Sequence, residues 1–444
     1  MSDVLTDLTL IRTAALDLLL AVDRIEAALH PQEPAGRPVT TSDELHAALL
    51  EGGTLLLQAG TRFEGRFVVS QSGTTVQANG ATFHSPSGPA WDVPAQEPAI
   101  TDIRLLDMAS VTAVADTPIL LGRNTPEQTR LEQVPRNITL ERVFVPSHNG
   151  PLAKNGLENN AINVTLLDCG IADVFNTRPA GILESHCLVT LNTPGGLTVR
   201  GGTYSGASIN FLSGGDPVDI PGVVIADLTY EGLTITKPPG WMTDGQFRLI
   251  KNLVEFKHGE RVVIRDCELS YSWGPEQRGW AFVFTPKTRG SVRDVLVDRC
   301  RVHHVGGGVN ITGRQLKIEN PVRTTGIRIL HSTFDIQHDS TRSEYGWFML
   351  LADGPGTIDV EDCEIRCSGT SLVRVDDTDR IERLAFRRCT IPKLPKYSVA
   401  TPLGNNAIRW QEVFDELTFQ DCVIGGAPAS FKALFPGNTY VDAA

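Results

Sequence analysis

A short pattern recurs along the chain, and it constrains the fold more than any other feature of the sequence. Its form is apolar-x-apolar-x-x-small-x-apolar, as in NVTLLDCGI, RVVIRDCEL, DVLVDRCRV and TIDVEDCEI. Each copy combines a strand-like alternation with a turn signal, and the copies follow one another at intervals of about 26 to 39 residues. A unit of this length cannot bury a core of its own, so we expect the strands of successive units to stack in a solenoid.

The small position of the pattern is most often a cysteine. Equivalent positions in stacked parallel strands lie about 4.8 Å apart, so the simplest account is a column of reduced, buried thiols. Disulfides are the alternative, whereas zinc has little support because the sequence has no CxxC pair. The predicted column consists of Ala81, Met108, Val143, Cys169, Gly202, Leu228, Cys267, Cys300, Ser332, Cys363, Cys389 and Cys422.

With these repeats, residues 39–440 resemble the right-handed parallel β-helix proteins of the pectate-lyase-like class. The opening stretch TTSDELHAALLEGGTLLLQAG is similar to the capping helix and first coils of that class, with Ser42 as the expected N-cap. The resemblance implies an all-β fold, a single-stranded right-handed parallel β-helix solenoid. That class includes lyases, hydrolases, epimerases and non-enzymatic virion spikes, so the fold leaves the function open.

The N-terminus predicts a separate helical segment, giving three parts: a helix over 1–30, a linker over 31–38 and the β-helix over 39–440. Apolar residues alternate at steps of four and three, which favours an α-helical coiled coil. A single amphipathic helix lying on the solenoid is the alternative, because further leucines widen the apolar face. The residues of the coiled-coil seam are Val4, Leu8, Ile11, Ala15, Leu18, Val22, Ile25 and Leu29.

Those seam residues leave the oligomer number open, but a parallel homotrimer is the arrangement we expect. It sets three β-helices side by side, as in the phage tailspikes that this sequence resembles in general organisation. Residues 1–30 would then contact other virion proteins.

The charge balance excludes some partners. The chain has 40 basic and 52 acidic residues, a formal net charge of -12, and no Lys/Arg-rich run, so a nucleic acid is not expected. No stretch approaches the roughly 18 apolar residues of a membrane span, and the start lacks a signal-peptide pattern. We therefore expect assembly in the host cytoplasm and residence in a virion; a cytoplasmic protein or one secreted by a non-classical route is the alternative.

Three functions fit these features. The first is a phage spike or tail-fibre-like protein that binds, and in some versions depolymerises, a host surface polysaccharide. The second is a cellular polysaccharide lyase, hydrolase or epimerase, for which the missing export signal is awkward. The third is a purely structural virion protein that uses the solenoid as a rod.

The stretch FRLIKNLVEFKHGERVV suggests where chemistry would take place. Val254 and Phe256 have the parity of the interior, which sends Leu253, Glu255 and Lys257 outward. By the same reasoning, in the following coils Phe282, Phe284, Val309 and Ile311 point inward, and Val283 and Asn310 point outward above Glu255.

A lyase needs a base and cations that neutralise a carboxylate, and a hydrolase needs two carboxylates; a solvated ion pair is the alternative. The predicted catalytic residues are Lys251, Glu255, Arg278, Lys287 and His304, with His303 nearby, and the predicted substrate-binding residues are Lys257, Trp273, Asn310, Arg374 and Asp376.

Other features carry weaker expectations. Asp376, Asp377 and Asp379 could hold Ca²⁺ or form an acid pair, although the same residues are ordinary in a turn; no other cofactor or metal is predicted. The polar stretch of Asp335, His338, Asp339 and Glu344 could form a groove wall. The glycines of HVGGGVN indicate a tight bend or a close approach to a ligand. Aromatic residues suited to sugar rings are Trp241, Tyr271, Trp273, Trp280 and Tyr345, of which Trp280 has interior parity.

Overall fold

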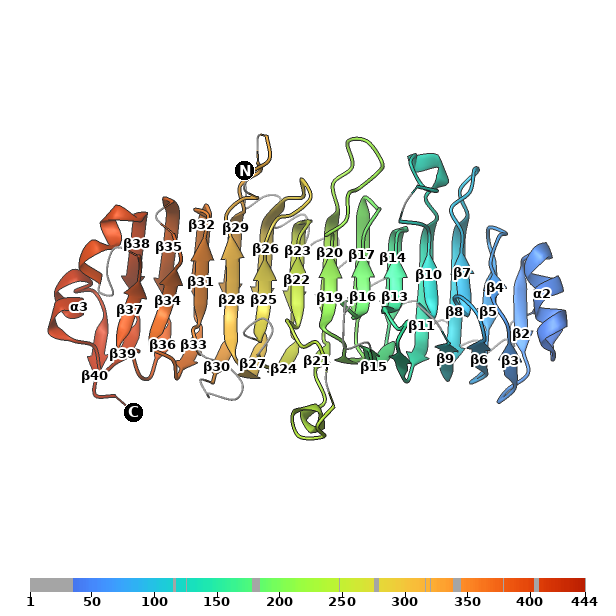
Figure 1. Ribbon diagram of the computed structural model, residues 1–444, viewed down its shortest axis with the longest axis horizontal. Coiled ribbons are helices and arrows are strands. Elements are labelled where there is room, and N and C mark those ends of the chain that lie inside the picture. The colour runs from blue at the N-terminus through green and yellow to red at the C-terminus, as the bar shows by residue number, and fades with distance from the viewer. Residues whose placement is uncertain are drawn as a thin grey trace.

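The structure is a long solenoid of parallel strands. The computed structural model describes residues 35–114, 117–124, 126–177, 184–246, 248–274, 279–315, 317–319, 321–337, 345–377, 379–402 and 407–443. Each coil contributes strands to three ladders, and successive coils stack side by side along the long axis (Figure 1). Every strand pairing is parallel, so the predicted all-β parallel β-helix is confirmed.

Two of the ladders form one 25-stranded sheet, because the long strand β11 bends from the first into the second. Ladder 1 contains β1 (Arg37–Val39), β2 (Thr54–Leu57), β5 (Thr75–Gln77), β8 (Thr101–Met108), β11 (Arg136–Val145), β14 (Ile162–Leu167), β17 (Gly195–Arg200), β20 (Ala226–Glu231), β23 (Gly259–Arg265), β26 (Val292–Asp298), β29 (Thr325–Leu330), β32 (Thr357–Glu361), β35 (Ile381–Arg387) and β38 (Phe414–Gln420). Ladder 2 contains β12 (His148–Gly150), β15 (Gly170–Asn176), β18 (Thr203–Gly206), β21 (Thr234–Thr236), β24 (Glu268–Ser272), β27 (Arg301–Val305), β30 (Thr333–Ile336), β33 (Glu364–Cys367), β36 (Thr390–Ile391), β39 (Val423–Gly425) and β40 (Thr439–Val441).

The third ladder is a separate 12-stranded sheet, and a small 3-stranded sheet accompanies the first coils. The 12-stranded sheet contains β4 (Phe67–Val68), β7 (Trp91–Val93), β10 (Ile119–Leu121), β13 (Asn155–Asn159), β16 (His186–Thr190), β19 (Ile209–Ser213), β22 (Val254–Phe256), β25 (Trp280–Phe284), β28 (Gly307–Thr312), β31 (Met349–Ala352), β34 (Ser371–Val375) and β37 (Tyr397–Ala400). The 3-stranded sheet contains β3 (Arg62–Glu64), β6 (Thr82–Ser85) and β9 (Ser110–Ala113).

Helices close both ends of the solenoid. Helix α2 (Ser42–Glu51) lies at the N-terminal end of the strands and α3 (Ala429–Leu434) at the C-terminal end (Figure 1). The N-cap of α2 is Thr41, one residue before the predicted Ser42, because Thr41 Oγ1 accepts from the backbone N–H of Glu44 and Glu44 Oε2 accepts from that of Thr41. Ser42 Oγ instead accepts from the backbone N–H of Glu64 on β3. Short 3-10 turns span Leu131–Gln133, Pro239–Met242 and Ala407–Glu412.

The predicted coiled coil over 1–30 lies outside the described residues, so the coiled coil, the trimer and the contact with other virion proteins stay predictions. The first strand, β1, begins at Arg37, inside the stretch expected as a linker. None of the helices in the described part of the chain has the length and apolar content needed to span a bilayer.

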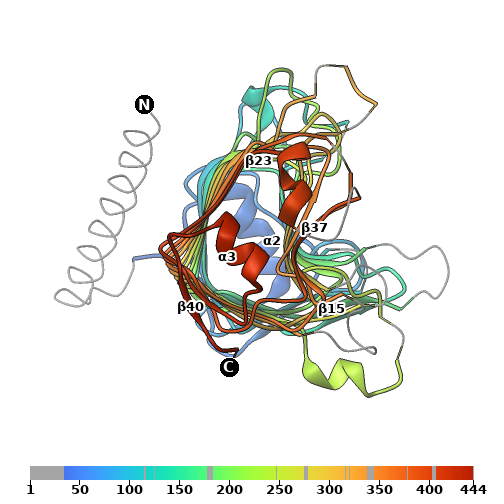
Figure 2. The same cartoon turned by 90° about the vertical axis from the view of Figure 1, so that its left-hand side faces the viewer.

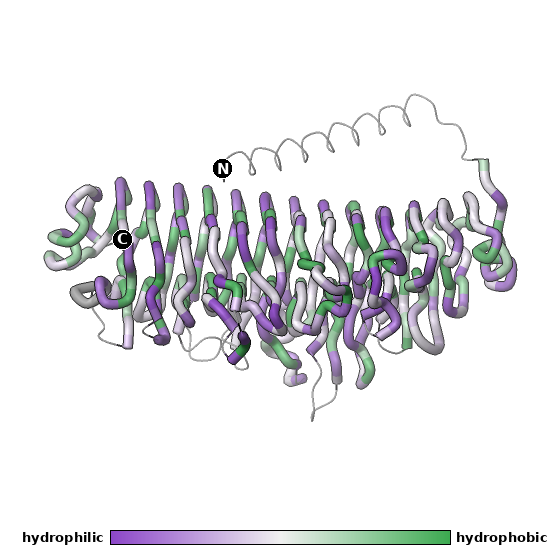
Figure 3. The backbone as a smooth tube through the Cα atoms, turned by 90° about the horizontal axis from the view of Figure 1, so that it is seen from above, coloured by the Kyte–Doolittle hydropathy of each residue, from purple (hydrophilic) through white to green (hydrophobic). Residues whose placement is uncertain are grey.

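One continuous apolar core fills the solenoid from end to end. Hydrophobic and hydrophilic positions alternate along the coils (Figure 3), which sends every second side chain of a strand into this core. All eight cysteines are unpaired, so the predicted ladder of reduced thiols is confirmed over the disulfide alternative. Leu228 is wrongly placed in the ladder: it pairs with Val262 in ladder 1, and the equivalent of Cys267 is Leu233, whose carbonyl accepts from the N–H of Glu268.

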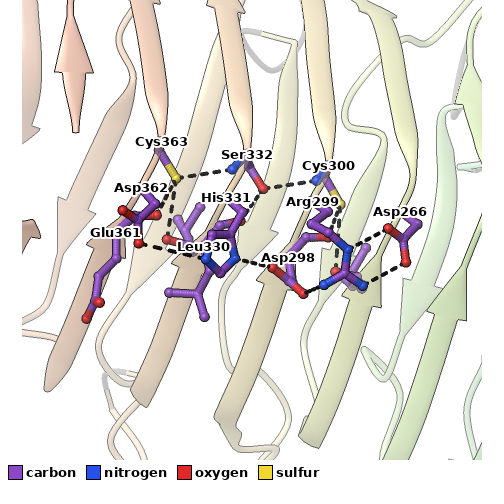
Figure 4. Close-up of polar contacts among 12 residues, drawn as sticks. Asp266, Asp298, Arg299, Cys300, Leu330, His331, Ser332, Glu361, Asp362 and Cys363 are labelled. Atoms are coloured by element: carbon purple, nitrogen blue, oxygen red, sulfur yellow. Dashed lines mark hydrogen bonds and ion pairs between the residues drawn. The ribbon is translucent and has the colours of Figure 1, made fainter. Parts of the chain in front are cut away.

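The ladder is held together by hydrogen bonds at the corner between ladders 1 and 2 (Figure 4). The thiol of Cys363 donates to the carbonyl of Glu361, two residues earlier, and Ser332 makes the same bond to Leu330 through its hydroxyl. This equivalence explains why serine can replace cysteine at one step of the column. Cys187 and Cys367 lie outside the column, on the strands of the other ladders.

The residue before each of these cysteines turns the chain with a positive φ and presents its side chain to solvent. Arg299, at φ 50°, donates from Nε and Nη2 to the two carboxylate oxygens of Asp266 on the preceding coil, at 2.8 and 2.9 Å (Figure 4). His331 lies 2.8 Å from Asp298 and 3.8 Å from Asp362. A left-handed conformation costs about 1 kcal/mol or more at a residue with a side chain, and ion pairs between successive coils offset part of that cost.

The outer face of the 12-stranded sheet, which we call the 12-stranded face, lies between two rows of protruding loops (Figure 2). Strand register aligns one outward residue from each of eleven consecutive strands in a central row. The residues of the central row are Asp92, Leu120, Glu158, Val189, Leu212, Glu255, Val283, Asn310, Leu350, Arg374 and Ala400.

Candidate functional site

The predicted orientation of β22 and its neighbours is confirmed at the centre of this row. Glu255 is in register with Val283, and Val283 with Asn310, while Val254 and Phe256 belong to the core. Leu253 is a correction: it was expected to face outward but is fully buried, because the chain turns into β22 at this point and the strand alternation starts only at Val254.

Lys251, Glu255 and Lys257 meet a residue that sequence reasoning missed, Glu184. The ammonium of Lys251 is hydrogen-bonded to Glu184 Oε1. Lys257 Nζ lies 3.8 Å from Glu184 Oε2 and 3.6 Å from Glu255 Oε1, so one lysine bridges two carboxylates. The two contacts together keep those carboxylate oxygens within about 7.4 Å of each other. Glu184, His186, Lys251, Glu255 and Lys257 are called the charged cluster below.

Stacked corners of the solenoid bring these residues together. Glu184 precedes β16, and Lys251 precedes β22, with the coil of β19 between them. That middle coil turns tightly through Ser208, whose carbonyl accepts from the N–H of Lys251, while Ser185 accepts from Ile209. Because the corner between the two loops is short, Glu184 can reach across it to Lys251.

A buried lysine fixes the floor of the cluster. Lys237 Nζ donates to four oxygens: the carbonyls of Ala207, Ser208 and Asn252 at 3.0, 3.1 and 3.1 Å, and Asn210 Oδ1 at 2.9 Å. The Lys237 side chain is fully buried. Asn252 in turn donates from Nδ2 to Glu255 Oε2 at 2.8 Å, so Lys237 positions the residue that orients Glu255.

His186 extends the charged cluster toward β13. The side-chain amide of Asn155 donates to Glu158 Oε2 at 2.9 Å, which leaves its Oδ1 to accept from His186 Nδ1 at 2.8 Å. The histidine proton therefore sits on Nδ1. His186 Nε2, buried and without a hydrogen-bond partner in the described part of the chain, faces Glu184 Oε2 at 3.9 Å.

The environment pushes the two groups apart in acidity. Burial lowers the pKa of His186, which favours the neutral ring. The adjacent His186, followed by Lys251 and Lys257, holds the pKa of the Glu184 carboxyl well below its usual range. At neutral pH the site therefore presents an ionised carboxylate beside a bare imidazole nitrogen, an arrangement suited to accepting or relaying a proton.

Apolar patches lie on both sides of the charged cluster. Val189, Leu191, Ile209 and Leu212 form the first patch, and Trp280, Val283, Trp347, Leu350 and the partly buried Tyr345 form the second. Trp280 is a second correction, because it packs on the outer face instead of in the interior that its parity predicted. At the first position of β25 its ring lies over Gly307, where a Cβ atom would stand 2.4 Å from the ring.

Gly307 thus explains the predicted close approach within HVGGGVN: the partner is the Trp280 ring of the same chain. The other aromatic residues are dispersed. Trp241 packs against Phe175 and under the Arg248 guanidinium, and Tyr271 stacks on His304. The expected single cluster of sugar-binding rings is therefore reduced, on the 12-stranded face, to the second apolar patch.

The remaining predicted site residues fall in several places. Asn310 and Arg374 lie in the central row, and Arg374 donates to Asp376 Oδ1 at 3.1 Å. Lys287 is exposed on the turn after β25, one coil from Lys257. Trp273 is buried at the end of β24. Arg278 lies outside the described residues.

The two histidines belong to another ladder. His303 and His304 lie on β27 in ladder 2, where His303 Nδ1 contacts His304 Nδ1 at 2.6 Å and His303 Nε2 contacts Glu268 at 2.8 Å. They form a separate polar group, and the geometry does not bring them to Glu255.

The three aspartates considered for Ca²⁺ have protein partners. Asp377 accepts from the backbone N–H groups of Asp353 and Asp379, and Asp379 also pairs with Arg314 at 2.9 Å. Within the described ranges, no three His, Cys, Asp or Glu side chains gather as metal ligands. Of the predicted groove wall, Asp335 lies on β30, and 338–344 fall outside the described residues.

What signal could have found Glu184 and His186? The stretch LESHCLVT places two ionisable residues directly before a buried strand, which is unusual for a plain connection. Their partners, however, lie 67 residues further along in the case of Lys251 and 31 residues back in the case of Asn155. Those distances depend on loop lengths and coil register, which the local pattern does not contain.

Comparisons with known proteins agree with the fold. The first is a tailspike protein from Acinetobacter baumannii bacteriophage Fri1, a capsular polysaccharide depolymerase (10% identity, 92% of this chain and 61% of that chain, TM-score 0.37). The second is a mannuronic acid specific polysaccharide family 6 lyase from human gut microbiota (9%, 92% and 91%, TM-score 0.49), and the third is the A-module of an Azotobacter vinelandii mannuronan C-5 epimerase (10%, 90% and 95%, TM-score 0.40).

At these identities the likeness extends to the solenoid fold alone, so the chain is a parallel β-helix protein of a class with many activities. No protein-family model and no curated protein matches the sequence.

Proposed function

We propose that this protein binds a polysaccharide along the 12-stranded face, with the charged cluster at the centre of the binding surface. The observation that carries the proposal is the bridging of Glu184 and Glu255 by Lys257 between two apolar patches. Sugar rings offer apolar faces and a rim of hydroxyl or carboxylate groups. Leucine, valine and tryptophan side chains suit the former, and lysines and carboxylates suit the latter.

The same cluster has the parts for cleaving the bound chain. Two carboxylates at this separation fit a pair of acid and base in glycoside hydrolysis, and two lysines fit the neutralisation of a uronate in β-elimination. Catalysis is a finer step than binding, and binding alone is sufficient for a spike.

A binding experiment tests the surface. Purified bacterial surface polysaccharides would be screened on an array with the wild-type chain, and the best ligand measured by calorimetry. We expect Lys257→Met to weaken binding at least about tenfold, because it leaves two carboxylates without their shared cation. Lys432→Met, an exposed lysine on α3 above Tyr440, is the matched control and should bind as wild type. Equal affinity for Lys257→Met and wild type would refute the proposal.

We further propose the virion spike over the cellular enzyme or a structural rod, with residues 1–30 as the trimerising segment. Native mass by light scattering should give a trimer for the full chain and a monomer for a chain that starts at Arg37. A monomer in both cases would contradict the spike and favour the cellular enzyme.

A further inference from the structure

A cavity on ladder 2 lies apart from the charged cluster. Its volume is about 550 Å³, within the range of sites that hold small ligands. It is bounded by β30, β33 and the segment after β36, which are neighbours near the C-terminal end of the solenoid (Figure 1). Its polar lining includes Asp335, Arg366, Ser368, Lys393 and Lys396.

The charge of this cavity is opposite to that of the whole chain. Three basic side chains and one acidic one line it, in a protein of net charge -12. Arg366 is paired with Glu364 at 2.7 Å, whereas Lys393 and Lys396 form no ion pair with any carboxylate among the described residues. Charges beyond about 8 Å are largely screened at physiological salt, so these local lysines decide which ligand is attracted.

The lysines are displayed on a rigid segment. Leu394, between them, is buried in the core, and its N–H donates to the carbonyl of Gly425 at 2.8 Å. Pro392 and Pro395 fix φ on either side of Leu394. A binding group that is already held in place loses little conformational entropy when a ligand arrives, so this arrangement suits recognition better than two free surface lysines would.

The floor of the cavity is equally constrained. Cys367 Sγ donates to the carbonyl of Gly346 at 2.8 Å, and Ser368 Oγ donates to that of Ile336 at 3.2 Å. A Cβ atom on Gly369 would stand 1.9 Å from the carbonyl oxygen of Tyr345, so only glycine fits there. The cavity is thereby joined to the segment that carries Tyr345 and Trp347 of the second apolar patch.

We propose that this cavity binds an anionic group of a saccharide, with Lys393 and Lys396 as its cations. The ligand chemistry is a carboxylate or a sulfate on a sugar ring. This site is separate from the charged cluster, so it does not require the cluster to bind or cleave anything.

Calorimetry with three defined hexasaccharides tests the proposal: oligogalacturonate, sulfated maltohexaose and neutral maltohexaose. For the wild-type chain we expect binding of one or both anionic hexamers and not of maltohexaose. Lys393→Met/Lys396→Met should weaken the anionic binding about tenfold and flatten its salt dependence, since two partly exposed charge contacts are lost. Lys432→Met should leave it unchanged, and the relative affinities of the two anions identify the group that the site prefers.

Two results would overturn this inference: equal affinity for the neutral and anionic hexamers, or unchanged affinity in the double variant. Thermal unfolding midpoints within 2 °C of wild type, an order-of-magnitude margin for surface substitutions, would establish that the double variant is folded. Lys257→Met separates the two proposals, because it should abolish polysaccharide binding at the 12-stranded face and leave the hexamer site intact.

Discussion

Replacing Lys237 with methionine is expected to lower the free energy of unfolding by about 3 kcal/mol. Methionine fills a similar volume but donates no hydrogen bond, so three backbone carbonyls and Asn210 Oδ1 lose a buried donor. Each unsatisfied buried group costs about 1 to 3 kcal/mol, and local relaxation recovers part of the total. The measurement is urea denaturation followed by tryptophan fluorescence.

Lys287→Met is the matched control, since that lysine is exposed on a turn and should change stability by less than about 0.5 kcal/mol. The Lys237 variant should also weaken polysaccharide binding, because Lys237 holds the Asn252 carbonyl and Asn252 holds Glu255. Stability equal to wild type would mean that the four acceptors find water or other donors, and that Lys237 does not fix the floor.

Replacing Glu255 with glutamine is expected to separate cleavage from binding. The amide keeps the shape of the side chain and its contact with Asn252, but it can neither take nor give a proton at neutral pH. Where the wild-type chain depolymerises its polysaccharide, we expect the variant to lose at least about 100-fold in rate, the lower range of general acid–base catalysis. Binding should fall by less than about tenfold, because Lys251 and Glu184 keep their ion pair.

Reducing ends and unsaturated products would be measured in parallel, since hydrolysis yields only the former and β-elimination yields both. Asp376→Asn, outside the charged cluster, is the control for loss of a single carboxylate from the same face. Full cleavage by Glu255→Gln would remove this residue from the chemistry. A wild-type chain that binds without releasing either product would make the 12-stranded face a binding surface only.

The fold followed from local patterns because a solenoid repeats one local solution. Alternation set which side of β22 faces the core, and the repeated small position set the corner column from Met108 to Cys422. Errors arose where a strand meets a corner. Leu253 and Trp280 lie at such positions, where the backbone turns and a two-residue period no longer determines the direction of a side chain. Leu228 was misplaced because it lies in a strand five residues before the corner position, Leu233.

The charged cluster was predicted only in part. Lys251, Glu255 and Lys257 were found because they lie on one short stretch, where parity suffices. Glu184, His186 and Asn155 were missed because they join through the stacking of three different coils, and the loops between those coils differ in length. His304 shows the opposite error, since nearness in sequence placed it beside Glu255 while the corner assigns it to another ladder.

The sequence alone therefore determined the architecture of this protein: parallel strands, a continuous core, a reduced cysteine column and an outward row containing Glu255. Those features depend on residue periodicity and on the steric and apolar character of single positions. Only the tertiary structure decided which charges meet, that Lys237 is buried under four oxygens and that two lysines line a cavity. Such contacts arise between coils, where strand register and corner length set distances that no local pattern records.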